Sequence, residues 1–182
     1  MGCDGGRTKM GWCMKNWMGS VVLAGICLTE AGGFAQTAGI DAMQAYAGTW
    51  KTQMEHFDTA YSKAGKESST LRNECWKSGG YYVCDQFVNG ESKALIVFTY
   101  SDKDKTYTTY PIMPGGNPAG KGKLVIEGNV WTYPWENTEN SKTTYFRVVN
   151  TFTAPNKIEF RQEFSTDKQN WTLMAKGSEV KQ

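Results

Sequence analysis

Histidine is nearly absent from this chain, and its scarcity excludes several kinds of site. It occurs once in 182 residues, at His56, so a metal centre built from several histidines is excluded. The sequence also contains no cysteine cluster with zinc-ligand spacing, no glycine-rich phosphate loop between a strand and a helix, and no serine in a nucleophile elbow. We therefore predict no metal site and no cofactor.

The chain also has no large excess of positive or negative charge. Lysine and arginine together number 20, against 18 for aspartate and glutamate, and the basic residues form no stripe that would suit nucleic acid. The apolar run over residues 17–28 is shorter than the ~20 residues that a membrane-spanning helix needs. We therefore predict no nucleic-acid partner and no membrane span.

The first 35 residues have the pattern of a secretory signal peptide. Basic residues precede the apolar run, and the small residues of Gly33-Phe34-Ala35 form an A-x-A-like cleavage site before Gln36. This order is typical of an exported protein. We predict cleavage after Ala35, a secreted or periplasmic location, and a single domain over residues 36–182.

Two alternatives concern this leader. Met14 is followed by a compact leader of its own, so translation that starts at Met14 would give the same mature protein. Cys27 would suit a lipid anchor, but Ile26 stands where lipoprotein signals require a small residue. We therefore favour plain export over lipid attachment.

Two cysteines of five remain after the leader, Cys75 and Cys84. An even pair in an exported protein favours oxidation. If Gly79-Gly80 forms a two-residue turn, Cys75 lies opposite Cys84 at a non-hydrogen-bonded pair, where side chains are close enough for a disulfide. We predict this disulfide; the alternative is two unpaired buried thiols.

The mature sequence is predicted to be almost entirely β-strand. Residues 40–47 place apolar residues on one helical face before Gly48, which predicts one or two helical turns. From Thr49 onward, polar and apolar residues alternate between turn-forming clusters. The predicted strands are Thr49–Phe57, Ser69–Ser78, Tyr81–Val88, Glu91–Tyr100, Thr106–Ile112, Lys123–Glu127, Val130–Glu136, Lys142–Phe152, Lys157–Ser165 and Trp171–Val180.

About ten antiparallel strands joined mostly by tight turns form a meander. An open sheet of this length would expose two unpaired edges, and closure into an up-and-down barrel removes them. We therefore predict an all-β fold, a closed lipocalin-like barrel with a short N-terminal helix. A two-sheet sandwich is the alternative.

Turn positions predict which side chains face the barrel interior. The strand at residues 157–165 places alternate charged residues on one face, which must lie in solvent. In the first hairpin we expect the face with Trp76, Tyr81 and Val83 to point inward, and the face with the cysteines to point outward. In the second half, the predicted inward residues are Trp131, Tyr133, Trp135, Tyr145, Arg147, Phe160, Gln162, Phe164 and Trp171.

Arg147 is the unusual member of this inward set. A guanidinium keeps its charge when buried and needs acceptors. Tyr145 and Gln162 offer too few, and the predicted register brings no acidic side chain beside them. We expect the missing partner to be an anionic ligand group; the alternatives are an internal hydrogen-bond network or a salt bridge across the barrel.

Gly48-Thr49-Trp50, at the start of the first strand, resembles the G-x-W opening of lipocalins and related calycin barrels. With the leader and the meander, the chain resembles uncharacterised bacterial secreted proteins with a lipocalin-like barrel, and residues 165–171 resemble their strand–turn–strand ending. The resemblance implies a central cavity for a small, largely apolar molecule. The sequence departs from lipocalins because the last strand offers only Lys176 where an arginine usually covers the tryptophan. It departs from nitrobindin-type haem barrels because His56 lies on the first strand.

Three functions follow from these observations. The first is a secreted or periplasmic barrel that binds a small apolar or anionic ligand without catalysis. Its predicted ligand-binding residues are Trp50, His56, Trp131, Tyr133, Trp135, Tyr145, Arg147 and Gln162. The second is a fully packed module that binds a protein or a glycan. The third is a small enzyme that uses His56 or a carboxylate at the barrel mouth as general base. The sequence predicts no oligomeric state.

Overall fold

The structure is a computed structural model that describes residues 39–182. The predicted signal peptide and its cleavage site at Ala35 lie outside the described residues. The account of the fold therefore begins at Gly39.

The first element is the short helix η1, a 3-10 helix at Gly39–Tyr46. The predicted helical turns over residues 40–47 are confirmed in position. Ala42, Met43 and Tyr46 are buried, and Met43 is completely inaccessible to solvent. The helix packs against strands β2, β3 and β4, so its apolar face belongs to the core.

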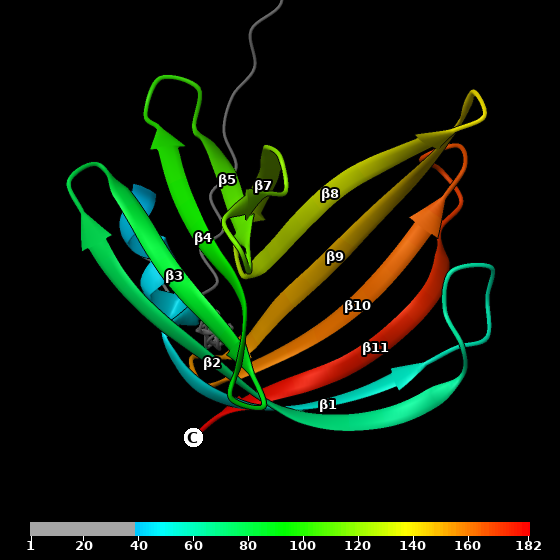
Figure 1. The fold of residues 1–182 in the computed structure, drawn as a ribbon, viewed down its shortest axis with the longest axis horizontal. Helices are drawn as coiled ribbons and strands as arrows, with labels where there is room; N and C mark the ends of the chain where they lie inside the picture. Colours follow the sequence, from blue (N-terminus) through cyan, green and yellow to red (C-terminus); the bar gives the residue numbers. More distant parts are fainter. Residues whose placement is uncertain (1–38) are drawn as a thin grey trace, which may run out of the picture. The chain divides into compact units, whose positions relative to one another are not determined.

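One antiparallel sheet contains the rest of the described chain (Figure 1). Its strands are β1 (Gly48–His56), β2 (Gly65–Ser78), β3 (Tyr81–Val88), β4 (Glu91–Ser101), β5 (Thr106–Met113), β6 (Asn117–Pro118), β7 (Gly122–Glu127), β8 (Val130–Glu139), β9 (Lys142–Ala154), β10 (Lys157–Ser165) and β11 (Thr172–Lys181). The main difference from the predicted strands is that β2 begins at Gly65, so the predicted long loop before it is short.

The sheet closes into a barrel. β1 pairs with both β2 and β11, and β4 pairs with both β3 and β5, so the meander has no free long edge. β6 pairs only with β5, which leaves ten of the eleven strands as the barrel wall. The predicted up-and-down barrel is confirmed, and the sandwich alternative is wrong.

The β2–β3 hairpin has the predicted register. Cys75 is paired with Cys84, their Cα atoms are 4.1 Å apart, and their sulfurs form a disulfide. The turn at Gly79-Gly80 supplies the positive φ that a two-residue turn needs, with Gly79 at φ 57°. The predicted disulfide is confirmed.

The prediction for the inner face of the first hairpin is wrong because a β-bulge in β4 shifts the pairing of β4 with β3. Gln86 pairs with Ala94 while Phe87 pairs with Ser92, so Lys93 is an extra residue in β4. One extra residue moves every later side chain to the other face. Cys84 therefore lines the interior with Ile96 and Phe98, and Trp76, Tyr81 and Val83 lie on the outer face.

A second bulge changes the register of β9 and β10. Ala154 pairs with Lys157, but Phe152 pairs with Ile158, so Thr153 is the extra residue. Arg147 consequently pairs with Glu163, where the prediction placed Gln162. Tyr145 and Arg147 therefore lie on the outer face, and the prediction that they point inward is wrong. Trp171 joins them there, because its ring lies under the Arg147 guanidinium.

The hydrophobic core includes side chains of η1 together with those of the barrel strands. Its largest fully buried side chains are Met43, Trp50, Leu124, Trp131 and Ile158. The Trp50 indole nitrogen donates a hydrogen bond to the Tyr46 carbonyl at 3.0 Å, which fixes η1 to β1. The Lys181 ammonium lies 5.1 Å from the Trp50 ring centroid. Lys181 therefore covers this tryptophan, whereas the sequence pointed to Lys176.

Candidate functional site

The site with the most chemistry is a cavity of about 410 Å³ inside the barrel. Its lining comes from η1 and from eight strands, which the closed sheet brings together although they are far apart in sequence. Apolar residues form much of the wall: Met54, Leu71, Ile96, Phe98, Val148 and Phe160. The disulfide-bonded Cys84 and a set of polar residues form the rest: Tyr46, Thr52, Asn73, Gln86, Tyr133, Asn150, Gln162 and Glu179. The cavity is therefore amphipathic.

A hydrogen-bond network around Tyr46 orients three of these amides. Asn73 donates from Nδ2 to the Tyr46 carbonyl at 3.2 Å, and Gln86 donates from Nε2 to Asn73 Oδ1 at 3.3 Å. Asn150 donates from Nδ2 to the Tyr46 hydroxyl at 2.9 Å. Gln86 and Asn150 thus each use one of their two amide N–H donors, and within residues 39–182 their carbonyl oxygens accept no hydrogen bond from another residue.

Glu179 is the one carboxylate in the lining. Burial raises its pKa from the usual 4.5 to about 7, because a charge loses solvation in a low-dielectric site. Within residues 39–182, no side chain donates a hydrogen bond or an ion pair to it. Thr52, its partner across β1 and β11, has a buried hydroxyl that also lacks a partner in the described chain.

The two tyrosines beside this carboxylate are neutral. Burial raises the pKa of Tyr133 well above its usual value, and the nearby charge of Glu179 adds to the shift. The same causes raise the pKa of Tyr46. Their hydroxyls therefore stay protonated at every pH at which Glu179 titrates.

Two of the predicted ligand-binding residues line this cavity, Tyr133 and Gln162. Trp50 and Trp131 face inward but are completely buried in the core. Trp135 stacks on Phe146, with ring centroids 5.4 Å apart, and is 47% exposed. Of the aromatic residues predicted to bind a ligand, Tyr133 alone lines the cavity.

Arg147 already has its partners on the outer face. Its Nε lies 2.6 Å from Glu163 Oε2, and Arg161 binds the other oxygen of the same carboxylate at 3.0 Å. The Arg147 guanidinium also stacks 3.8 Å from the Trp171 ring centroid. The expectation that no acidic side chain lies beside Arg147 is wrong, because the shifted register places Glu163 there.

His56 does not line the cavity. Its Nε2 lies 3.5 Å from Glu67 Oε1, and the Glu67 side chain is 56% exposed. This arrangement is an ion pair near the end of β1 whenever the imidazole is protonated. Among residues 39–182, no group of three potential ligands from His, Cys, Asp and Glu could hold a metal ion.

Sequence reasoning missed Glu179 together with Thr52, Asn73, Gln86 and Asn150. A signal for Glu179 was present. The turn at residues 165–170 predicts an inward Ala175 opposite Phe160, and residues two and four positions later must share its face. That alternation leads from Ala175 through Gly177 to Glu179. In the structure Ala175 is buried but pairs with Gln162, and Gly177 pairs with Phe160. The three amides gave no such signal, because their register depends on the two bulges.

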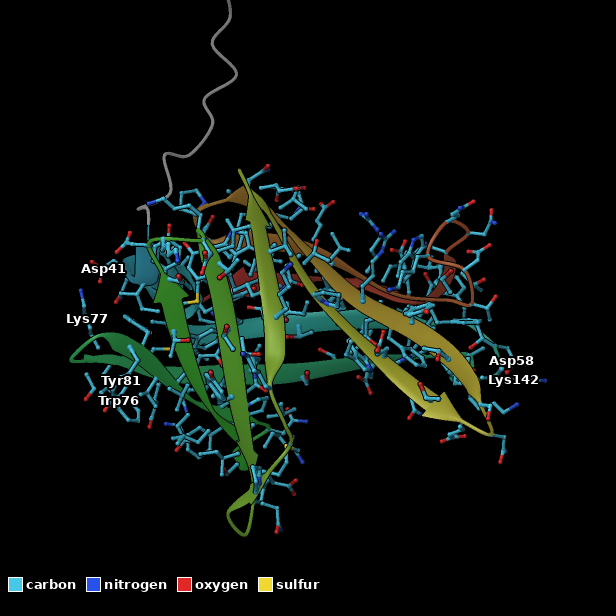
Figure 2. All side chains as sticks on the ribbon, turned by 90° about the horizontal axis from the view of Figure 1, so that it is seen from above. Asp41, Asp58, Trp76, Lys77, Tyr81 and Lys142 are labelled. Atoms are coloured by element: carbon cyan, nitrogen blue, oxygen red, sulfur yellow. A yellow bond between two sulfur atoms is a disulfide. The ribbon has the colours of Figure 1, made fainter. Side chains whose placement is uncertain are left out.

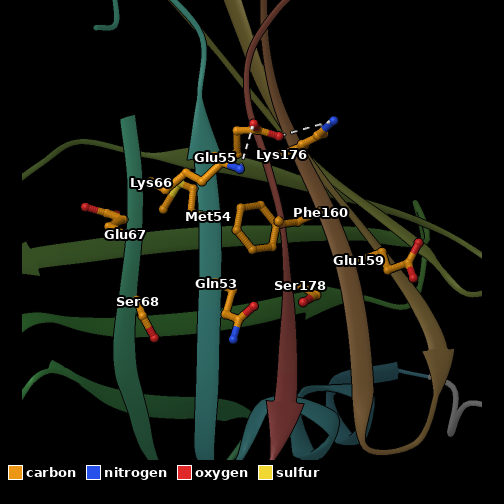
Figure 3. Close-up of a pocket in the computed structure, with 11 residues that line it drawn as sticks. Gln53, Met54, Glu55, Lys66, Glu67, Ser68, Glu159, Phe160, Lys176 and Ser178 are labelled. Atoms are coloured by element: carbon orange, nitrogen blue, oxygen red, sulfur yellow. Dashed lines mark ion pairs between the residues drawn. The ribbon is translucent and has the colours of Figure 1, made fainter. Parts of the chain in front are cut away.

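A second hollow of about 680 Å³ lies over β1, β2, β10 and β11 (Figure 3). Its charged residues are already paired: Glu55 contacts Lys66 at 3.5 Å and Lys176 at 3.4 Å. Figure 3 shows the Phe160 ring lying across β11 toward β1, at the position where Gly177 has no side chain. Because its charges are paired, this hollow offers a ligand fewer free groups than the internal cavity.

Comparison with known proteins shows neither a family nor a ligand for this chain. No protein-family model matches the chain, and no curated protein sequence is similar to it. The crystal structure of Rv2717c from M. tuberculosis is similar with a TM-score of 0.44 and 8% identity, over 79% of this chain and 96% of that chain. An identity this low transfers neither ligand nor activity.

No helix in the described part of the chain has the length and apolar character needed to cross a membrane. The Cys75–Cys84 disulfide is consistent with an exported protein, because such bonds persist in oxidising compartments.

Proposed function

We propose that this protein binds a small amphipathic molecule in its internal cavity and is a binding protein. The observation that carries the proposal is a cavity of about 410 Å³ that combines an apolar wall with buried polar groups lacking partners. Ligand pockets typically enclose ~300–1,000 Å³ and contain a few polar groups that orient the ligand. Leaving a buried polar group unpaired costs ~1–3 kcal/mol, so a ligand that supplies partners removes this cost.

The anionic ligand expected from Arg147 has no anchor in this cavity. Arg147 is paired with Glu163 on the outer face, and the lining contains no lysine, arginine or histidine. We therefore propose an amphipathic ligand without the anionic group that the sequence predicted.

A second candidate function, the binding of a protein or glycan, is favoured by the outer face of the β2–β3 hairpin. Trp76 and Tyr81 are 47% and 43% exposed, and Figure 2 shows both side chains on the hairpin, near Lys77. Exposed aromatic side chains that gather on one face are typical of interaction surfaces. Replacing Trp76 with serine would abolish such binding without changing ligand uptake by the cavity.

We also propose that the domain is exported after cleavage at Ala35. The disulfide supports export, and the proposal is tested by N-terminal sequencing of the protein recovered from the periplasm or the medium. The sequence should begin at Gln36. Recovery of a chain that retains Lys15 would contradict the proposal.

Binding in the cavity is tested with N-phenyl-1-naphthylamine, a neutral apolar dye whose fluorescence rises on binding. Ile96→Phe adds volume inside the cavity, and Val97→Phe adds the same kind of ring on the outer face of the same strand. We expect Ile96→Phe to weaken dye binding at least tenfold and Val97→Phe to leave it unchanged. Equal effects, or no binding to the unaltered protein, would contradict the proposal.

A further inference from the structure

The charged residues that line the cavity favour a positively charged ligand. Glu179 is its only acidic residue, and the lining has no basic residue to neutralise it. Lys181 follows on the same face of β11, but its ammonium lies over the Trp50 ring and makes no ion pair with Glu179 in the described chain. A negative charge in a low-dielectric site attracts a cation strongly and repels an anion.

The hydrogen-bonding groups favour a donor. Gln86 and Asn150 each use one amide N–H within the protein, which leaves their carbonyl oxygens and one further N–H each for a ligand. The Glu179 carboxylate accepts hydrogen bonds only, and the Thr52 hydroxyl also accepts. A ligand that satisfies this set must bring several N–H or O–H groups.

The remaining wall favours an apolar body on the ligand. Leu71, Ile96, Phe98 and Phe160 contribute side chains to the same cavity. A flat ring or a short alkyl chain removes these side chains from contact with water, worth about 25 cal/mol per Å² of apolar surface buried.

We propose that the cavity binds a small organic amine, with its protonated nitrogen paired to Glu179 and its apolar body against Leu71, Ile96 and Phe98. This inference rests on the proposed binding function and names the chemical class of the ligand. The carboxylate supplies the counter-charge, and the carbonyl oxygens of Gln86 and Asn150 are available for the other ammonium protons. The raised pKa of Glu179 agrees with a carboxyl group that lacks a counter-ion.

The test compares three probes of similar size by calorimetry at pH 8: 2-phenylethylamine, 2-phenylethanol and 3-phenylpropionate. The amine should bind at least tenfold more tightly than the alcohol, because a charge-assisted pair is worth ~1.5–3 kcal/mol. The propionate should bind most weakly. Glu179→Gln should remove the preference for the amine. Glu127→Gln, which replaces an exposed carboxylate at the end of β7, should preserve it.

A pH series adds a readout that does not depend on any variant. The groups facing Glu179 are Thr52 on β1, Ile158 on β10, the neutral Tyr46 and Tyr133, and Lys181. Thr52 and Ile158 carry no titratable group, and burial keeps both tyrosines protonated, so amine binding should strengthen between pH 5 and 8 as Glu179 ionises. Alcohol binding should not strengthen.

The outcomes separate the inference from the proposed function. If the alcohol binds as tightly as the amine, or if Glu179→Gln leaves the preference intact, the amine proposal is overturned and the binding function stands. If none of the three probes nor N-phenyl-1-naphthylamine binds, both are overturned.

Discussion

Glu179 and Thr52 lie directly opposite each other on β11 and β1, and both line the barrel cavity. The Thr52 hydroxyl has no hydrogen-bond partner in the described chain, and no described side chain forms an ion pair with the Glu179 carboxylate. A folded domain normally pairs such groups. A ligand that supplies partners to both groups would therefore stabilise this part of the barrel.

The first prediction concerns stability against pH. The pKa of Glu179 is about 7 in the folded state and 4.5 in its usual surroundings. Below pH 4.5 the group is protonated in both states and costs nothing. As pH rises toward 7, the unfolded state ionises first, so the fold loses stability. Glu179→Gln should therefore stabilise the protein more at pH 8 than at pH 4, by up to about 3 kcal/mol in urea unfolding free energy.

Glu127→Gln is the control for this pH effect. Glu127 is exposed beside the β7–β8 turn, so its replacement should give the same small change at both pH values. If Glu179→Gln also gave the same change at pH 4 and pH 8, the carboxyl would not be buried as the structure describes.

The second prediction concerns the disulfide. Replacing Cys75 and Cys84 together with alanine should lower the unfolding free energy by roughly 2–3 kcal/mol, because the short cross-link restricts the unfolded chain. The far-UV circular dichroism should not change, since the sheet is closed without the bond. Peptide mapping of the unreduced protein should recover the two cysteines in one linked peptide. Their recovery as free thiols would contradict the structure.

Local patterns were enough to predict the fold. Alternation and turn residues predicted the strands, and Gly79-Gly80 predicted the register of the disulfide hairpin. Closure followed from the cost of open edges. The faces failed where a bulge intervened, at Lys93 and at Thr153. Neither residue is a glycine, and a bulge without one leaves no clear mark in a single sequence.

The site was harder to predict for the same reason. An error of one position in β9 moved Arg147 inside and Asn150 outside, which reversed the expected charge of the ligand. The inward position of Gln162 survived because β10 carries its own evidence: its charged face must be in solvent. Positions fixed by one strand's composition, or by pairing across a tight turn without a bulge, were thus predicted, and positions that depend on pairing across a bulge were not.

The third prediction concerns Arg147. Arg147→Met removes a charged hydrogen bond to Glu163 and the contact with Trp171, and should cost about 1–2 kcal/mol of unfolding free energy. Arg161→Met should cost less, because Arg161 is more exposed, at 46% against 27%, and Glu163 would keep Arg147. Neither change should alter binding of N-phenyl-1-naphthylamine. A selective loss of dye binding in Arg147→Met would show that Arg147 contributes to the binding site and would contradict this prediction.

The last prediction concerns Gly177, whose missing side chain makes room for Phe160. A Cβ atom at Gly177 would collide with the Phe160 ring and with the backbone oxygen of Gln53. The backbone cannot move easily, because β11 is hydrogen-bonded to both β1 and β10. Gly177→Ala should therefore lower the unfolding free energy by about 1–3 kcal/mol, as overpacking does, and should weaken dye binding by displacing Phe160 from the cavity wall. Gly65→Ala is the matched control, because a Cβ there meets no atom within 4 Å. Equal stability of the two variants would show that Phe160 does not lie against β11.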